Sequence, residues 1–288
     1  MEQYDIALLG GDTRTAYMAP YFLEKGYRVI CYGIENVVRD DEYPFIYAKT
    51  LKEAVEQSDY IVGGIPLFKE GKVFSKQNMP DRESDELCQC LRKKQIVFGG
   101  VIPQDFMEMC KEREIGCYDF MKDEALAVFN AIATAEGSIL EALKYQKTNI
   151  HGSKSLVLGY GRCGRVLAEK LRGLGADLTV CSRCEVELAY ADAFGLNTLS
   201  LKDLEGKVHK FEYIYNTVPA VLLGKNILER MRRDVLVIDI ASGLGGVDYY
   251  SAEKMGIAAL HCLGLPGKYA PKISAKRLVD FVIYKIER

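Results

Sequence analysis

Short apolar runs alternate with amphipathic helical patterns along almost the whole chain. This alternation is typical of parallel β-sheets whose strands are joined by crossover helices. It predicts an α/β protein with two doubly wound parallel-sheet lobes. Strands of the first lobe are expected near residues 5–9, 28–32, 60–62, 96–98 and 116–118, and strands of the second near 155–158, 177–181, 212–215, 234–238 and 257–261.

Between these lobes one long helical pattern covers residues 123–147, and Asp123 is placed to cap its first turn. At about 100° per residue, the larger apolar side chains fall on one face, and Glu136 falls within their stripe. The opposite face carries small or polar side chains that would let another element or a ligand approach closely. The apolar face comprises Val128, Phe129, Ile132, Ile139 and Leu143, and the opposite face Ala127, Asn130, Thr134, Gly137 and Glu141.

The predicted lobes divide at this helix. Residues 1–122 are expected to form the lobe that meets the substrate and a partner, and residues 123–273 the second lobe. A last helix within residues 274–288 carries Leu278, Phe281, Val282 and Ile286 on one stripe, so we expect it to pack back on the first lobe. The polar stretch 68–83 is expected to form a mobile loop.

Composition and charge exclude several classes of protein. With 288 residues, 49% hydrophobic and 27% charged, the chain is unlike disordered, collagen-like or coiled-coil sequences. Its apolar runs are strand-sized and no secretory signal pattern opens it, so we expect a cytoplasmic protein without a membrane span. The balance of 38 Lys and Arg against 40 Asp and Glu offers no broad field for nucleic acid or anionic lipid.

The nine cysteines are odd in number and are expected to be reduced thiols. Cys181 and Cys184 form a C-x-x-C pair, but no second pair follows at zinc-finger spacing and the three histidines are scattered. We therefore expect no metal site.

The most informative segment is a strand that runs into Gly159-Tyr-Gly161-Arg162-Cys163-Gly164 and then into an amphipathic helix. This context distinguishes a dinucleotide-binding fingerprint from a chance glycine pattern. The first glycine permits a tight turn, the second lets the backbone approach a pyrophosphate, and the third lets helix and strand pack closely. The second lobe is therefore predicted to be a Rossmann domain.

The end of the next strand bears on the choice of cofactor. NAD-preferring sites place Asp or Glu there, about 20 residues beyond the glycines, to accept from the ribose hydroxyl. Here the strand ends in Ser182 and Arg183. A hydroxyl and a guanidinium suit a 2′-phosphate, which favours NADP. Alternatively, Arg183 pairs with Glu185 or Glu187 at the surface.

Two further strand ends are expected to border the nicotinamide. One is followed by Asn216, Thr217, Val218 and Pro219, and the other by Asp239, Ile240, Ala241 and Ser242. Ligands of open α/β sheets bind at these carboxyl ends. Ordinary strand-ending turns use the same residue types.

Cationic side chains provide candidate anchors for an anionic substrate. Arg14 follows a glycine turn after the first strand, while Lys268 and Lys272 lie in a Gly/Pro-rich loop before the last helix. A guanidinium at a helix start suits a carboxylate. The alternatives are that Arg14 pairs with Asp40, Asp41 or another acid, and that the two lysines are simply solvated.

Together these motifs resemble those of the A-subunit family of dipicolinate synthase, and they occur in order from the first strand to the final helix. They are Gly10-Gly-Asp-x-Arg14, Asn130-Ala-Ile-Ala-Thr-Ala-Glu-Gly137, His151-Gly-Ser-Lys154, Gly159-Tyr-Gly-Arg-Cys-Gly164, Asn216-Thr-Val-Pro219 and Gly264-Leu-Pro-Gly-Lys268 through Pro271-Lys272.

The resemblance implies oxidation of a dihydrodipicolinate-level intermediate, from the diaminopimelate and lysine pathway, to pyridine-2,6-dicarboxylate. It implies a setting in the mother cell of a spore-forming bacterium. It also implies a heteromeric assembly with the flavoprotein-like B-subunit of the synthase. A cyclic dicarboxylate needs separated cations, which Arg14, Lys268 and Lys272 would supply.

Oxidation of such a ring also needs a proton acceptor. Glu136, as a carboxylate within an apolar stripe, is the candidate base, with Asn130 beside the ring. Glu136 also suits a purely structural role as a hydrogen-bonded acid. Two other functions stay open: a non-catalytic NADP(H)-binding scaffold or sensor, and another NADP-dependent hydroxy- or keto-acid dehydrogenase.

Overall fold

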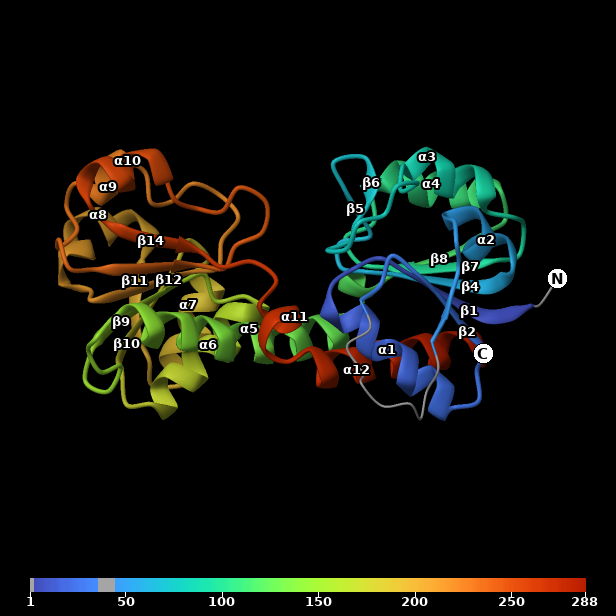
Figure 1. Ribbon diagram of the computed structural model, residues 1–288. Coiled ribbons are helices and arrows are strands. Elements are labelled where there is room, and N and C mark those ends of the chain that lie inside the picture. Colours follow the sequence, from blue (N-terminus) through green and yellow to red (C-terminus); the bar gives the residue numbers. More distant parts are fainter. Residues whose placement is uncertain (1–2, 36–44) are drawn as a thin grey trace. The chain divides into compact units, whose positions relative to one another are not determined.

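The computed structural model describes residues 3–35 and 45–288 of the chain. The chain divides into two compact units, one formed by Met1–Ala127 with Ala270–Arg288 and the other by Val128–Tyr269. Each unit is built on a six-stranded parallel sheet, and Figure 1 shows helices on both faces of each sheet. The predicted α/β class with two doubly wound lobes is confirmed.

The first unit places its earliest strand at the centre of its sheet, where the order is β3-β2-β1-β4-β7-β8 and all pairing is parallel. Its elements are β1 (Tyr4–Leu9), α1 (Thr13–Glu24), β2 (Val29–Tyr32), β3 (Ile46–Tyr47), α2 (Leu51–Glu56), β4 (Ser58–Gly63), β5 (Phe68–Lys69), β6 (Lys72–Val73), α3 (Ser84–Cys90), β7 (Ile96–Gly99), α4 (Gln104–Glu112), β8 (Gly116–Asp119), η1 (Phe120–Lys122), the start of α5 (Glu124–Tyr145) and α12 (Pro271–Ile286).

Residues 6–9 of strand β1 show why a strand of this sheet is apolar on both of its faces. Successive side chains point to opposite faces of a sheet. Ile6 and Leu8 pack among residues of α1 and α12, whereas Ala7 and Leu9 pack among residues of α2, α3 and α4. Because helices cover both faces, neither set of side chains meets water.

The second unit repeats this plan with the order β11-β10-β9-β12-β13-β14, again wholly parallel. Its elements are the remainder of α5, β9 (Lys154–Leu158), α6 (Arg162–Gly173), β10 (Asp177–Ser182), α7 (Glu185–Ala193), β11 (Asn197–Ser200), η2 (Leu201–Asp203), α8 (Leu204–Lys207), η3 (Val208–Lys210), β12 (Tyr213–Asn216), α9 (Lys225–Leu228), β13 (Leu236–Asp239), α10 (Tyr249–Met255), β14 (Ala258–His261) and α11 (Leu265–Tyr269).

Two edge strands and one hairpin differ from the sequence expectations. Edge strand β3 is exposed and edge strand β11 is largely polar, so neither shows the apolar run that marks a buried strand. The stretch 68–83, predicted to be a mobile loop, instead begins with the antiparallel hairpin β5–β6. Its turn uses Glu70 and Gly71, both at positive φ, which matches the twist of a tight hairpin.

The buried face of α5 differs from the predicted one. Val128, Ile132 and Leu143 are exposed, while small residues such as Ala131 and Ala135 are buried. The helix packs through its small side chains because they let neighbouring elements approach closely. Asp123 caps it as predicted, by accepting a hydrogen bond from the Leu126 amide at 2.9 Å.

Helix α5 is also long and apolar enough to cross a membrane by length and composition alone. The sequence expectation considered only uninterrupted apolar runs and overlooked this alanine-rich segment. Half of its most apolar window is buried inside the protein. The helix is therefore weak evidence for a membrane span.

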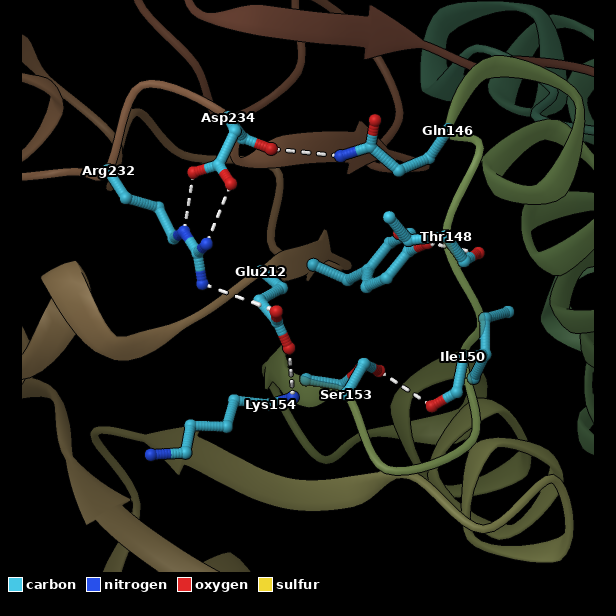
Figure 2. Close-up of polar contacts among 10 residues, drawn as sticks. Gln146, Thr148, Ile150, Ser153, Lys154, Glu212, Arg232 and Asp234 are labelled. Atoms are coloured by element: carbon cyan, nitrogen blue, oxygen red, sulfur yellow. Dashed lines mark hydrogen bonds and ion pairs between the residues drawn. The ribbon is translucent and has the colours of Figure 1, made fainter.

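Polar contacts fix the segment that connects α5 to β9 (Figure 2). The Gln146 side chain donates to the Asp234 carbonyl at 2.9 Å, and the Lys154 amide donates to the Glu212 carboxylate at 2.9 Å. Ser153 Oγ donates to the Ile150 carbonyl at 2.7 Å. The motif His151-Gly-Ser-Lys154 thus lies at the start of β9 and orders it.

Helix α12 belongs to the first unit. Its Leu278, Val279 and Val282 are buried in one cluster with Met18 and Phe22 of α1. Residues 270–273 also belong to this unit, whereas the sequence placed them in the second. Lys272 is therefore a residue of the first unit.

We predict that Leu278→Ala lowers the free energy of unfolding by about 2 to 4 kcal/mol, because it leaves a cavity between α12 and α1. The control is Ile273→Ala on the same helix, where the side chain is 50% exposed. Urea denaturation of both variants measures the difference. Equal, small effects would show that α12 contributes little to the first unit.

Candidate cofactor-binding site

The glycine loop connects β9 to α6 in the conformation that its sequence predicts. Gly159 has φ +88°, in the left-handed region that glycine tolerates, and its amide donates to the Cys181 carbonyl at 2.8 Å. Gly161 is the residue that precedes α6, and a Cβ built on it meets no atom within 4 Å. The backbone is therefore open to a ligand at Gly161.

The third glycine lets α6 pack against the loop. A Cβ on Gly164 would lie 2.1 Å from the Gly159 carbonyl oxygen, closer than any side chain allows. Arg162 and Cys163 belong to the first turn of α6, and the N-terminus of a helix suits an anion. Burial raises the pKa of the Cys163 thiol, so it is neutral at neutral pH.

A cavity of about 510 Å³ lies in front of this loop. It reaches from the glycine loop to the ends of β10 and β12, which are the strands on either side of β9. Ligands bind at such a point, where the order of the strands reverses. Its lining residues are Gly159, Tyr160, Gly161, Cys181, Ser182, Arg183, Cys184, Glu187, Leu201, Thr217, Val218, Pro219, Ala220 and Leu222.

The end of β10 differs from the expectation that no carboxylate is present. Arg183 is exposed and makes no ion pair with Glu185 or Glu187 in the described part of the chain. Instead, Glu187 extends from α7 and accepts a hydrogen bond from Ser182 Oγ at 2.6 Å. It also lies 3.4 Å from the Tyr160 amide of the glycine loop.

The ends of β12 and β13 are organised by Asp239, one of the strand-end residues expected to border the nicotinamide, although its organising role was not predicted. Its buried carboxylate accepts hydrogen bonds from Asn216 Nδ2 at 2.9 Å, from the Ala241 amide at 3.0 Å, from the Gly246 amide at 2.6 Å and from Tyr249 Oη at 2.7 Å. The available signal was an acid that ends a wholly apolar strand. Asn216 is fully buried and orders this network.

Three other predicted nicotinamide neighbours, Thr217, Pro219 and Ala241, differ in exposure. Thr217 Oγ1 donates to the Leu158 carbonyl at 2.8 Å, so it joins β12 to the glycine loop, and Pro219 is exposed at the cavity. Ala241 is buried, and its carbonyl contacts His261 Nε2 at 3.0 Å. The loops after β12 and β13 are thus held by their own polar contacts.

Glu136 does not lie in a buried apolar stripe. Its side chain is 57% exposed and forms an ion pair with Lys170 Nζ at 2.8 Å. The expectation that Glu136 lies in an apolar environment is therefore wrong. The role of Glu136 as the general base stays a prediction. Asn130 is half-buried on α5, and its carbonyl accepts from Thr134 Oγ1 at 2.9 Å.

Lys268 lies on α11 and forms an ion pair with Glu141 of α5. Tyr269 Oη donates to the same carboxylate, and both contacts hold the pKa of Glu141 below its ordinary value. Gly137 makes this arrangement fit, because a Cβ there would lie 2.9 Å from atoms of Leu265 and Tyr269. The small face of α5 was correctly predicted to receive another element.

Arg14 and Lys272 belong to the first unit. Arg14 is buried and binds Asp12 through Nε at 2.9 Å and Nη2 at 2.8 Å. Its partner is thus an acid two residues away, while Asp40 and Asp41 lie outside the described residues. Lys272 is exposed, with Nζ 5.5 Å from the centroid of the Tyr17 ring.

The cysteines form no disulfide, and all nine are free. Within residues 3–35 and 45–288, no group of three or more His, Cys, Asp or Glu side chains is arranged to hold a metal ion.

The glycine loop, its cavity and the strand order define a nicotinamide-dinucleotide-binding domain of the dehydrogenase type. Residues 128–246 match the family described as D-isomer specific 2-hydroxyacid dehydrogenase, NAD binding domain. Residues 5–121 match the N-terminal domain of the dipicolinate synthase A-subunit. The chain belongs to the family of dipicolinate synthase A-subunits, since it is 30% identical over 287 residues to the Bacillus subtilis member, with 96% of this chain and 93% of that protein covered.

Two solved structures have the same fold over the whole chain. The dipicolinate synthase A-subunit from Bacillus halodurans superposes with a TM-score of 0.86 at 26% identity, covering 100% of this chain and 99% of the other. The A chain of dipicolinate synthase from Bacillus subtilis gives a TM-score of 0.82 at 27% identity, and the match covers 99% of this chain and 96% of the other. The chain is thus an oxidoreductase with a nicotinamide cofactor site.

We predict opposite consequences for two alanine substitutions in the glycine loop. Gly164→Ala forces its Cβ against backbone and lowers the free energy of unfolding by about 1 to 3 kcal/mol. Gly161→Ala leaves the free energy of unfolding unchanged, because its Cβ meets no protein atom within 4 Å. It lowers dinucleotide affinity at least about tenfold, because the Cβ blocks the approach of the pyrophosphate.

Calorimetric titration and urea denaturation separate the two effects. The control is Gly173→Ala at the end of α6, where a Cβ also meets nothing within 4 Å. Unchanged dinucleotide affinity in Gly161→Ala would show that the ligand does not approach this backbone.

Proposed function

We propose that this protein oxidises a dihydrodipicolinate-level cyclic intermediate to dipicolinate, with NADP as hydride acceptor. The observation that supports it is a single chain that carries, over nearly its full length, both the N-terminal domain of the A-subunit family and a dinucleotide site. In this role it would work in the cytoplasm of a sporulating mother cell, in an oligomer with a flavoprotein-like B-subunit.

The reaction removes two electrons from the ring. A hydride leaves a ring carbon for the nicotinamide, and a ring proton leaves for a base, so that an aromatic pyridine results. Formation of the aromatic ring favours this proton loss. Glu136, with Asn130 near the ring, stays the proposed base, and water is the alternative acceptor.

Arg14, Lys268 and Lys272 are the proposed anchors for the two carboxylates. Asp12 fixes Arg14 and Glu141 fixes Lys268, so each cation is oriented before a ligand arrives. Such prior orientation reduces the entropy cost of holding a small dianion.

We predict that neutralising Arg14 or Lys268 lowers kcat/KM at least about a hundredfold, while NADP affinity stays within about twofold. Lys276→Gln is the matched control for Lys268, because both side chains are 53% exposed. The assay follows formation of reduced nicotinamide and dipicolinate from the cyclic substrate, and melting temperatures identify variants that fail to fold.

Normal turnover by folded Arg14 and Lys268 variants would contradict the assignment of the anchors. If the unaltered chain binds NADPH but oxidises no cyclic dicarboxylate, alone or with the B-subunit, the function is that of a nucleotide-binding scaffold or sensor. Oxidation of a hydroxy acid instead would identify another dehydrogenase.

The preference for NADP rests on Arg183, which is exposed at the cavity without an ion-pair partner in the described part of the chain. We predict that Arg183→Ala lowers NADP affinity at least about tenfold by removing a charge-assisted contact to the 2′-phosphate, while NAD affinity changes little. Calorimetry with both cofactors measures this. Equal affinity of the unaltered protein for NADP and NAD would contradict the preference.

A further inference from the structure

A carboxylate occupies the part of the cavity where a dinucleotide places its adenosine ribose. Glu187 lines the cavity together with Ser182 and Arg183 at the end of β10. This strand end is where dehydrogenases of this fold contact the ribose 2′ position. The cavity therefore presents groups of opposite preference, a guanidinium that attracts a phosphate and a carboxylate that repels one.

The position of Glu187 is fixed by contacts with both sides of the cavity. Ser182 Oγ donates to it at 2.6 Å, and the Cys184 amide donates to Ser182 Oγ at 3.0 Å. Ser182 is only 6% exposed, so it is a rigid donor. The Tyr160 amide, 3.4 Å from the same carboxylate oxygen, connects Glu187 to the glycine loop.

In the usual Rossmann site, the carboxylate that binds the ribose stands at the end of the second strand itself. In this protein it comes from the helix that follows. The carboxylate comes from the first turn of α7 and reaches back to the last residue of β10. At that point a carboxylate accepts hydrogen bonds from ribose hydroxyls, whereas a 2′-phosphate would place like charges a few ångströms apart.

We propose that Glu187 is a specificity-determining residue, which opposes the 2′-phosphate of NADP and favours the free ribose hydroxyl of NAD. This inference rests on the proposed use of a nicotinamide dinucleotide. Arg183 and Glu187 set cofactor choice by acting in opposite directions. For the 2′-phosphate of NADP to bind, the Glu187 carboxylate must leave its hydrogen bonds with Ser182 Oγ and the Tyr160 amide.

The test is calorimetric titration of NADP and NAD into the full chain and into Glu187→Gln. Removal of the charge is expected to raise NADP affinity at least about fivefold and to leave NAD affinity equal or lower. The matched control is Glu185→Gln, which makes the same charge change on the same turn of α7 but does not line the cavity. It should change the ratio of the two affinities less than about twofold.

The inference is overturned if the ratio of NADP to NAD affinity changes as little in Glu187→Gln as in Glu185→Gln. It is also overturned if Glu187→Gln shifts this ratio toward NAD. Melting temperatures without cofactor check that the glutamine variant is folded. Preference of the unaltered protein for NAD would contradict the proposed use of NADP while leaving the Glu187 effect measurable. Failure of the unaltered protein to bind either cofactor would contradict both proposals.

Discussion

The close approach of α6 to β9 is the constraint on which the cofactor site depends. A Cβ on Gly164 would lie 2.1 Å from the Gly159 carbonyl oxygen, so α6 can begin beside the strand end only if that side chain is absent. The same approach places the start of α6 beside the cavity, and the first turn of a helix suits an anion. Thr217 joins β12 to this point through the Leu158 carbonyl. Backbone packing thus forms the site. The side chains at the end of β10 and on α7 then determine which cofactor it selects.

The sequence predicted the elements whose side chains are buried on both faces. Residues 6–9 of β1 and 236–238 of β13 are continuous apolar runs because helices cover both sides of their sheets. The buried face of α5 was assigned wrongly, because the prediction relied on large apolar residues, whereas small residues such as Ala131, Ala135 and Gly137 are the buried ones. Size and closeness of packing, which hydrophobic periodicity does not report, determined which face is buried.

The polar residues of the site were harder to predict. Their types and their places at strand ends were apparent, but their partners were not. Lys268 pairs with Glu141, which is 127 residues away, and only the fold brings them together. Glu187 was considered only as a surface partner for Arg183, because its reach back to Ser182 depends on how α7 leaves β10. A sequence shows which charges exist, and the fold decides which of them neutralise one another.

The two units share a strand order, yet only the second leaves its glycine turn open. In the first unit, Gly11 donates to the Phe74 carbonyl at 2.6 Å and accepts from the Lys76 amide at 2.9 Å. Ser75 Oγ donates to the Gly33 carbonyl at 2.8 Å, at the end of the neighbouring strand. The chain itself therefore satisfies the backbone groups that a pyrophosphate would otherwise meet. The first turn also lacks the G-x-G-x-x-G spacing of the second, so the sequence and the covering segment distinguish the two turns in the same way. This difference assigns the dinucleotide to the second unit and frees the first for another role.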